Sequence, residues 1–230
     1  MVELVKSVTV VDKSSASEGR LRIHEIFYSL QGETSRVGLP TVFVRLTGCP
    51  LRCGYCDTAY AFHGGSTQSL TQILSTVAGY QARYVTVTGG EPLAQKDCPK
   101  LLMALCDAGY SVSLETSGAI DISAVDARVS RIVDIKTPGS GEVTKNHWAN
   151  VDLLMPHDEV KFVLCDRADY DWAVEALNRH ALADRCPVLF SPAYDALNPT
   201  TLAEWILHDR LPVRMQIQLH KYLWGETPGR

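Results

Sequence analysis

The chain has 230 residues, of which 46% are hydrophobic and 21% are charged, and its formal net charge is −4. This size and composition predict a single globular domain with a sizeable hydrophobic core. The acidic balance and the lack of a long Lys/Arg run argue against direct nucleic-acid binding or an anionic membrane surface. No apolar stretch approaches the roughly 18–20 residues that a bilayer-spanning helix needs.

The first 20 residues are expected to form a flexible N-terminal segment ahead of one domain that covers residues 21–230. Residues 1–19 contain neither the apolar core nor the small-residue cleavage site of a signal peptide. The chain has seven cysteines, and reduced thiols are their simplest state in a chain without a secretory signal. The sequence therefore predicts a cytoplasmic protein.

Apolar, β-branched runs alternate with helical patterns along the chain. The predicted strands are 22–28, 41–47, 83–88, 111–115, 131–135, 160–164, 187–190 and 213–219. The predicted helices are 70–79, 98–108, 122–127, 168–180 and 200–209. Strands that alternate with helices predict βαβ units and a parallel sheet. Six or seven strands fit this pattern, fewer than the eight of a full (β/α)8 barrel, so we predict an α/β fold with a partial, open barrel.

Chemically active side chains follow five of the predicted strands, at the point where each strand ends. The five clusters are 49–58, 88–92, 115–118, 134–136 and 220–221. Parallel α/β sheets bind their ligands at the C-terminal ends of the strands. We therefore expect the five clusters to form one site.

The most informative cluster holds Cys49, Cys53 and Cys56 in the spacing C-x3-C-x2-C. Structural zinc sites and ordinary iron–sulfur clusters take four protein ligands, so this triplet is one ligand short. Three thiolates on a [4Fe–4S] cluster leave one iron open, and the amino and carboxylate groups of S-adenosylmethionine suit that position. The alternative is a zinc site that a side chain such as His63 completes.

The clusters after the next strands offer groups to a bound cofactor. A Gly-Gly pair that ends at Gly90 allows the main chain to approach an amino group, and Glu91 can accept a hydrogen bond from that group. Glu115 and Ser117 can bind a ribose or a heterocycle, and Lys136 can hold a carboxylate. The alternatives are ordinary strand-ending turns and a surface lysine.

Three further elements offer polar groups to a substrate. Gln31 and Glu33 present donor and acceptor groups to a heterocycle, although a hairpin turn at Gly32 is also compatible with this run. Arg45, in the middle of a predicted strand, is a candidate clamp for a substrate carboxylate or an arginine on the solvated face. The Thr58 hydroxyl can complete a Mg²⁺ octahedron.

Together these motifs resemble the radical S-adenosylmethionine enzymes and, more narrowly, the 7-carboxy-7-deazaguanine synthase family. The wider resemblance rests on the cysteine triplet and on the run 89–92. The narrower resemblance rests on the runs 30–33, 56–58, 115–118 and 218–221, together with Thr88. It extends from about Leu21 to the C-terminus.

The resemblance implies a specific reaction. In that family, 6-carboxy-5,6,7,8-tetrahydropterin is converted to 7-carboxy-7-deazaguanine by ring contraction with loss of ammonia, a step towards queuosine and other deazapurines. It implies a [4Fe–4S] cluster that reduces S-adenosylmethionine to a radical, with S-adenosylmethionine recycled and Mg²⁺ on the substrate carboxylate. It also implies a homodimer and an external electron donor such as flavodoxin.

The family's site residues transfer to this chain by motif. Cys49, Cys53 and Cys56 hold the cluster, and Thr58 contacts Mg²⁺. The implied pterin-binding residues are Leu30, Gln31, Gly32, Glu33, Arg45, Thr88, Glu115 and His220. Those implied for S-adenosylmethionine are Gly90, Ser117 and Lys136.

Two other functions are compatible with parts of the pattern. A glycyl-radical-enzyme activase shares the cysteine spacing and a similar size, but it needs a groove for a protein substrate. A zinc-stabilised binding module would use the cysteines without catalysis. The run 30–33 and Arg45 favour a small carboxylated heterocycle over both.

Overall fold

The computed structural model describes residues 19–225, 227 and 229. The described strands are β1 (Arg20–Leu30), β2 (Pro40–Leu46), β3 (Ser66–Ser69), β4 (Tyr84–Gly89), β5 (Ser111–Thr116), β6 (Ser130–Asp134), β7 (Glu159–Leu164), β8 (Val188–Pro192) and β9 (Arg214–Met215). The described α-helices are α1 (Leu70–Gly79), α2 (Cys98–Asp107), α3 (Arg167–Arg179), α4 (Pro199–Asp209) and α5 (Leu219–Trp224).

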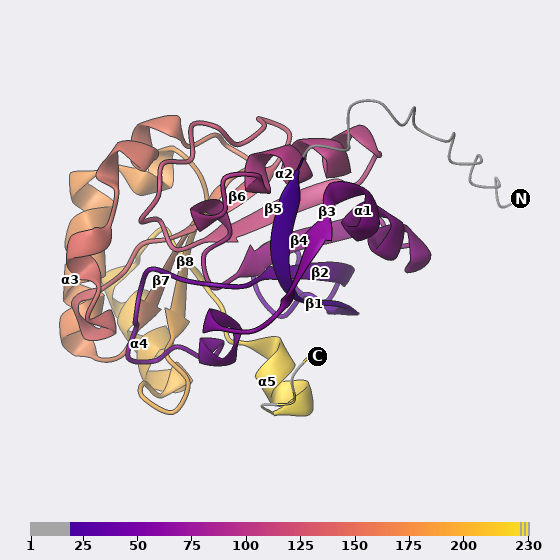
Figure 1. Cartoon of the computed structure of the whole chain (residues 1–230). Helices are drawn as coiled ribbons and strands as arrows, with labels where there is room; N and C mark the ends of the chain where they lie inside the picture. Colours follow the sequence, from indigo (N-terminus) through magenta and orange to yellow (C-terminus); the bar gives the residue numbers. More distant parts are fainter. Residues whose placement is uncertain (1–18, 226, 228, 230) are drawn as a thin grey trace, which may run out of the picture.

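The described strands form one curved sheet that does not close on itself. Its order is β3-β1-β2-β4-β5-β6-β7-β8-β9, so β3 and β9 are the edges. Every neighbouring pair from β2 to β9 is parallel, whereas β1 runs antiparallel to both β2 and β3. Helices α1 to α4 lie outside the curved sheet, and α5 lies at one end of it (Figure 1). The predicted partial, open barrel is confirmed.

The two faces of the sheet have opposite character because side chains alternate along each strand. On β4, Val85 and Val87 are fully buried in the core cluster, which also contains Ile73 of α1 and Leu101 of α2. Thr86 and Thr88 alternate with these valines along β4, so they point to the opposite face, which is the inner face of the curved sheet. The helices therefore cover an apolar face, and the inner face is left for polar side chains.

The helix predicted over 122–127 is wrong, because this stretch forms turns. Asp121 accepts hydrogen bonds from the backbone N–H and the hydroxyl of Ser123, each at 2.8 Å. Asp126 accepts from the backbone N–H of Arg128 at 2.9 Å. Such local side-chain bonds compete with helical hydrogen bonds, so the connection from β5 to β6 contains turns in place of a helix.

The strand predicted over 213–219 is also largely wrong, since β9 pairs with β8 only at Arg214 and Met215. The next polar side chains bond elsewhere: Gln216 Oε1 accepts from the backbone N–H of Thr34 at 2.7 Å. The helix α5 then begins at Leu219. The short strand β3 was not predicted, because its sequence STQS carries no apolar alternation.

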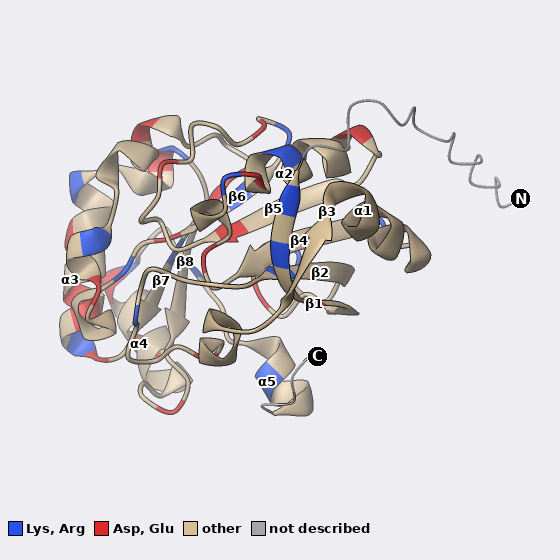
Figure 2. Ribbon diagram, in the orientation of Figure 1, with Lys and Arg blue, Asp and Glu red and all other residues tan. Residues whose placement is uncertain are grey.

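The N-terminal prediction mostly concerns residues outside the described ones, which begin at Gly19, and Arg20 already belongs to β1. No described helix is both long enough and apolar enough to span a membrane. Basic and acidic residues are interspersed along the ribbon, for instance on α3 (Figure 2).

Asp158→Ala should lower the free energy of unfolding by roughly 3–5 kcal/mol, because it leaves the buried Arg131 guanidinium without its counter-charge. Asp158 is fully buried and pairs with Arg131 where β6 and β7 begin. Urea unfolding followed by circular dichroism measures the change.

The matched control is Glu175→Ala, which breaks the exposed Arg179–Glu175 pair on α3. It should cost less than about 1 kcal/mol. Equal costs for the two variants would contradict a structural role for the buried pair.

Candidate active site

A cavity of about 500 Å³ lies at the C-terminal ends of the parallel strands. Of the residues that the sequence assigns to the site, all but Glu91 line it: Leu30, Gln31, Gly32, Glu33, Arg45, Cys49, Cys53, Cys56, Thr58, Thr88, Gly90, Glu115, Ser117, Lys136 and His220. The expected convergence of the strand-end clusters therefore occurs. The individual role of each residue stays a prediction.

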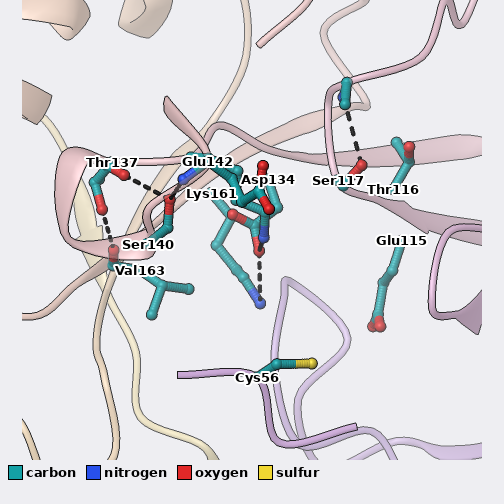
Figure 3. Close-up of polar contacts among 12 residues, drawn as sticks. Cys56, Glu115, Thr116, Ser117, Asp134, Thr137, Ser140, Glu142, Lys161 and Val163 are labelled. Atoms are coloured by element: carbon teal, nitrogen blue, oxygen red, sulfur yellow. Dashed lines mark hydrogen bonds and ion pairs between the residues drawn. The ribbon is translucent and has the colours of Figure 1, made fainter. Parts of the chain in front are cut away.

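The cysteine loop follows β2 and is held by the loop after β6. The backbone N–H of Gly54 donates to the carbonyl of Ser140 at 3.1 Å, and that of Arg52 donates to Glu142 Oε1 at 2.6 Å. Ser140 Oγ in turn accepts from the backbone N–H of Glu142 (Figure 3). These contacts fix the loop from outside while its thiols face the cavity.

The three thiols fit a cluster that needs three cysteine ligands. Cys49, Cys53 and Cys56 are free and half-buried, and all three line the same cavity. Burial raises the pKa of Cys49 and Cys53, so an electropositive centre would be needed to hold them as thiolates. Within the described residues, no three His, Cys, Asp or Glu side chains form a group that could hold a single metal ion.

Gly90 brings the end of β4 against the cysteine loop. A Cβ at this position would lie 2.2 Å from the Gly48 carbonyl oxygen and 2.8 Å from Cys49 Cβ, so only glycine fits without displacement. The backbone N–H of Glu91 donates to the Gly48 carbonyl at 2.8 Å. Close packing, rather than an unusual backbone angle, is what requires the glycine.

The prediction that Glu91 accepts from a ligand differs from what the structure shows. Its fully buried carboxylate accepts from the Thr116 hydroxyl at 2.9 Å and from the backbone N–H of Ser117 at 2.6 Å. It also accepts from the backbone N–H of Leu93 at 2.9 Å. Glu91 therefore joins the ends of β4 and β5, and does not appear among the residues that line the cavity.

A hydrogen-bonded carboxylate and amide form one wall of the cavity. Glu115 accepts from the Thr88 hydroxyl at 2.9 Å and from the Gln31 side-chain amide at 3.1 Å. The Gln31 amide also donates to Thr86 at 3.3 Å, which lies on the same inner face of β4 as Thr88. Burial raises the pKa of Glu115, and the neighbouring Glu33 carboxylate adds to the shift. Gln31 is 3% exposed, so these polar groups are oriented by one another.

Glu33 is a second carboxylate in this wall, with a different environment. Lys161 Nζ lies 2.6 Å from Glu33 Oε2, and the Gln218 side-chain amide donates to Glu33 Oε1 at 3.0 Å. Burial alone would raise the pKa of Glu33, but the Lys161 ammonium, together with the Gln218 hydrogen bond and the His220 side chain, outweighs burial and lowers this pKa to about 2. Glu33 is therefore ionised at neutral pH.

His220 lies in the first turn of α5, not at the end of a strand as predicted. A Cβ on Gly32 would lie 2.3 Å from His220 Nδ1, so the glycine makes room for the imidazole. The backbone N–H of Leu219 donates to the Gly32 carbonyl at 3.0 Å. This contact is a structural role for Gly32 that the sequence did not indicate.

Arg45 faces the cavity and not the solvated face of the sheet, which decides between the two orientations that the sequence left open. Its Nε lies 2.7 Å from Glu25 Oε1, and the same oxygen accepts from the Tyr60 hydroxyl at 2.9 Å. The guanidinium carbon lies 5.8 Å from the ring centres of both Phe27 and Tyr60. Glu25 was missed, although its place in β1 opposite Arg45 follows from the antiparallel register.

Lys136 and Asp134 close the far wall of the cavity. Their side chains form an ion pair at 3.1 Å, and Lys136 Nζ lies 5.9 Å from the Tyr55 ring centre. Burial opposes the charge on Lys136, but Asp134 outweighs it and raises the pKa of the lysine.

Lys161 was missed by sequence reasoning. The available signal was a lysine flanked by buried apolar residues in β7.

Comparison with known proteins places the chain in a family. Residues 43–183, more than half of the chain, match the Radical SAM superfamily. The chain therefore belongs to this superfamily, whose enzymes use a [4Fe–4S] cluster and S-adenosylmethionine. The structure of SuiB from Streptococcus suis has a TM-score of 0.53 at 12% identity and shares the fold alone.

More similar relatives narrow the family. The 7-carboxy-7-deazaguanine synthase of Chlorobaculum tepidum is 47% identical, over 91% of this chain and 97% of that protein. The protein of that name from Koribacter versatilis is 43% identical, over 91% and 100% of the two chains. The crystal structure of QueE from Escherichia coli has a TM-score of 0.71 at 27% identity, covering 87% of this chain and 95% of that one.

The chain thus belongs to the 7-carboxy-7-deazaguanine synthase family of radical S-adenosylmethionine enzymes. Membership predicted from the motifs is confirmed. The chain therefore does not belong to the glycyl-radical-enzyme activases or to a family of non-catalytic zinc modules.

Cys53→Ala should abolish the visible absorption of the reconstituted cluster, because two protein thiolates cannot replace three. Absorption spectra and bound iron per chain measure the loss. The control is Cys106→Ala, which changes a half-buried thiol of α2 that does not line the cavity and should leave both unchanged. A normal cluster in Cys53→Ala would contradict the ligand assignment.

Gly90→Ala should reduce cluster incorporation to below about half that of the wild type, since the added Cβ collides with Gly48 and Cys49. Iron content after anaerobic reconstitution measures this effect.

Gly79→Ala is the matched control, because a Cβ there has no neighbour within 4 Å. It should incorporate iron like the wild type. Normal incorporation in Gly90→Ala would show that the close approach does not shape the cysteine loop.

Proposed function

We propose that this chain converts 6-carboxy-5,6,7,8-tetrahydropterin to 7-carboxy-7-deazaguanine with loss of ammonia, as a carbon–nitrogen lyase in deazapurine and queuosine biosynthesis. The observation that carries the proposal is a single cavity that joins three cysteine thiols to a wall of carboxylates and an amide. A ring-shaped, polar substrate in that cavity would lie beside the radical source. The names of the relatives support this assignment.

The bound cluster and S-adenosylmethionine would supply the carbon radical that starts the reaction. Cys49, Cys53 and Cys56 would hold the cluster. Gly90, which lets the end of β4 pack against the cysteine loop, would present its main chain to the cofactor, and Lys136 offers an ammonium that Asp134 keeps charged.

The carboxylate wall would orient the pterin ring. Glu33 is ionised and accepts hydrogen bonds, so it would bind N–H groups of the pyrimidine portion. Gln31, held between Thr86 and Glu115, adds an amide of fixed direction. A buried wall of this kind selects a small heterocycle by its pattern of donors and acceptors.

Arg45 would bind the substrate carboxylate. Glu25 holds its Nε, and the Phe27 and Tyr60 rings lie near the guanidinium, so its direction is fixed before a substrate arrives. A bound carboxylate would approach the part of the guanidinium that faces the cavity.

Thr58 is the proposed protein ligand of a Mg²⁺ ion that also contacts the substrate carboxylate. It lies two residues beyond Cys56, and its hydroxyl is 3.8 Å from the Cys56 thiol. Thr58 would therefore lie between the cysteines and the carboxylate wall. A hydroxyl together with substrate oxygens and waters suits Mg²⁺. The proposal includes a cytoplasmic homodimer, an external donor such as flavodoxin, and a single domain.

Anaerobic incubation of the reconstituted protein with S-adenosylmethionine, a reductant and 6-carboxytetrahydropterin should yield a deazapurine and ammonia. Mass spectrometry and an ammonia assay measure the products. Omitting Mg²⁺ should slow turnover by at least about tenfold, because the substrate carboxylate loses a ligand that orders it.

Two outcomes would contradict the proposal in different ways. Production of 5′-deoxyadenosine without any deazapurine would remove the pterin as the substrate while leaving the radical chemistry intact. Equal rates with and without Mg²⁺ would remove only the metal and the role of Thr58.

A further inference from the structure

Lys161 has no assigned role, although its ammonium lies in the wall of the cavity. It belongs to β7, where the parallel register sets it beside Asp134 of β6. Its side chain is 16% exposed and reaches two carboxylates, Glu33 Oε2 at 2.6 Å and Asp134 Oδ2 at 3.9 Å. A lysine in such a place needs a partner, and here it has two.

Lys161 links two halves of the site. Glu33 belongs to the proposed pterin wall, whereas Asp134 also pairs with Lys136, on the proposed S-adenosylmethionine side, at 3.1 Å. Figure 3 shows Asp134, Lys161, Glu115 and Cys56 around the same space. A chain of alternating charges therefore runs from one half to the other, with Lys161 at its centre.

We propose that Lys161 is a positioning residue for substrate binding, whose ammonium holds the Glu33 carboxylate ionised and directed at the pterin ring. This inference rests on the proposed function. It goes beyond that function because it gives a role to a residue that has no expected contact with substrate or cofactor. Without Lys161, the buried Glu33 would lose the cation that it contacts directly and would keep the neutral Gln218 amide as its remaining described side-chain partner.

The charges around Glu33 come from several elements, and each must be considered in a pH experiment. Lys161 and the Gln218 amide contact it directly, at 2.6 and 3.0 Å. The described groups nearby are Lys161 on β7, Glu115 on β5, Asp134 on β6, Gln218, His220 and Lys221 at α5, and Asp57 on the cysteine loop, with which Lys221 pairs. The wild type is therefore the reference at each pH.

The sign of the pH effect follows from this arrangement. Against the effect of burial, Lys161 is the largest of the influences that lower the pKa of Glu33 to about 2, and the Gln218 hydrogen bond and the His220 side chain add to it. Removal of Lys161 takes away the largest influence that lowers this pKa and leaves burial opposed only by the Gln218 hydrogen bond and the His220 side chain, so the pKa of Glu33 rises. The ratio of the variant's substrate Kd to the wild-type Kd should therefore increase as pH falls.

The test measures the Kd of 6-carboxytetrahydropterin by anaerobic calorimetry, on cluster-loaded protein saturated with S-adenosylmethionine, from about pH 8 to about pH 5.5. Lys161→Met should weaken binding by roughly tenfold at pH 8 and by at least a further ~3-fold at pH 5.5. Lys161→Arg should restore binding to within ~3-fold of the wild type and remove the extra pH dependence. Lys96→Met, which changes an exposed lysine, should behave like the wild type.

The visible spectrum of the cluster shows whether each variant is assembled. If Lys161→Met fails to assemble, Glu33→Gln provides the second test, since it removes the charge that Lys161 is proposed to maintain. It should bind the pterin weakly, with a Kd that changes with pH no more than that of the wild type.

Three results would overturn the inference: wild-type affinity in Lys161→Met, a weakened Kd whose ratio to the wild type is constant across pH, or wild-type affinity in Glu33→Gln. A wild-type protein that does not bind the pterin at all would overturn the proposed function itself. The two failures are therefore distinguishable.

Discussion

The buried carboxylate of Glu91 is the interaction on which the site depends most. It binds the Thr116 hydroxyl and the Ser117 N–H at the end of β5, while its own backbone N–H binds Gly48 at the start of the cysteine loop. These contacts fix the ends of three neighbouring strands, β2, β4 and β5, to one another. Because Glu91 is fully buried, a break in this network would leave its carboxyl group without hydrogen-bond partners, which is costly.

The parallel register of the strands brings the side chains of the site together. It sets Arg45 beside Thr88, and Asp134 beside Lys161, with all four side chains lining the cavity. Each carboxylate then acquires a different environment: Glu115 has hydroxyl and amide donors, whereas Glu33 has an ammonium. Two carboxylates with pKa values displaced in opposite directions give one wall two distinct recognition properties.

Much of this site could be predicted because its chemistry is local in sequence. The cysteine triplet, the Gly-Gly pair and the strand-end clusters each lie within a few residues, and strand polarity alone predicts that they converge. The role of Glu91 could not be predicted in this way. Its partners Thr116 and Ser117 come from the next strand, and their hydrogen bonds depend on three-dimensional register.

The errors in the fold have the same origin. Residues 122–127 carry a helical apolar pattern, but Asp121 and Asp126 bind nearby backbone groups and produce turns. The sequence after Met215 continues like a strand, yet Gln216 and Gln218 bond to Thr34 and Glu33, far away in the chain. Side-chain hydrogen bonds of this kind override periodicity and are not visible in it.

The central claim is that the inner face of this sheet binds a carboxylated pterin, with Arg45 on its carboxylate. The most direct measurement is the anaerobic Kd of 6-carboxytetrahydropterin compared with that of tetrahydropterin, which lacks the carboxylate, in the wild type and in Arg45→Ala. The wild type should prefer the carboxylated ring, and Arg45→Ala should lose roughly 2–5 kcal/mol of binding to that ring alone. Equal affinity of the wild type for both rings would contradict the account.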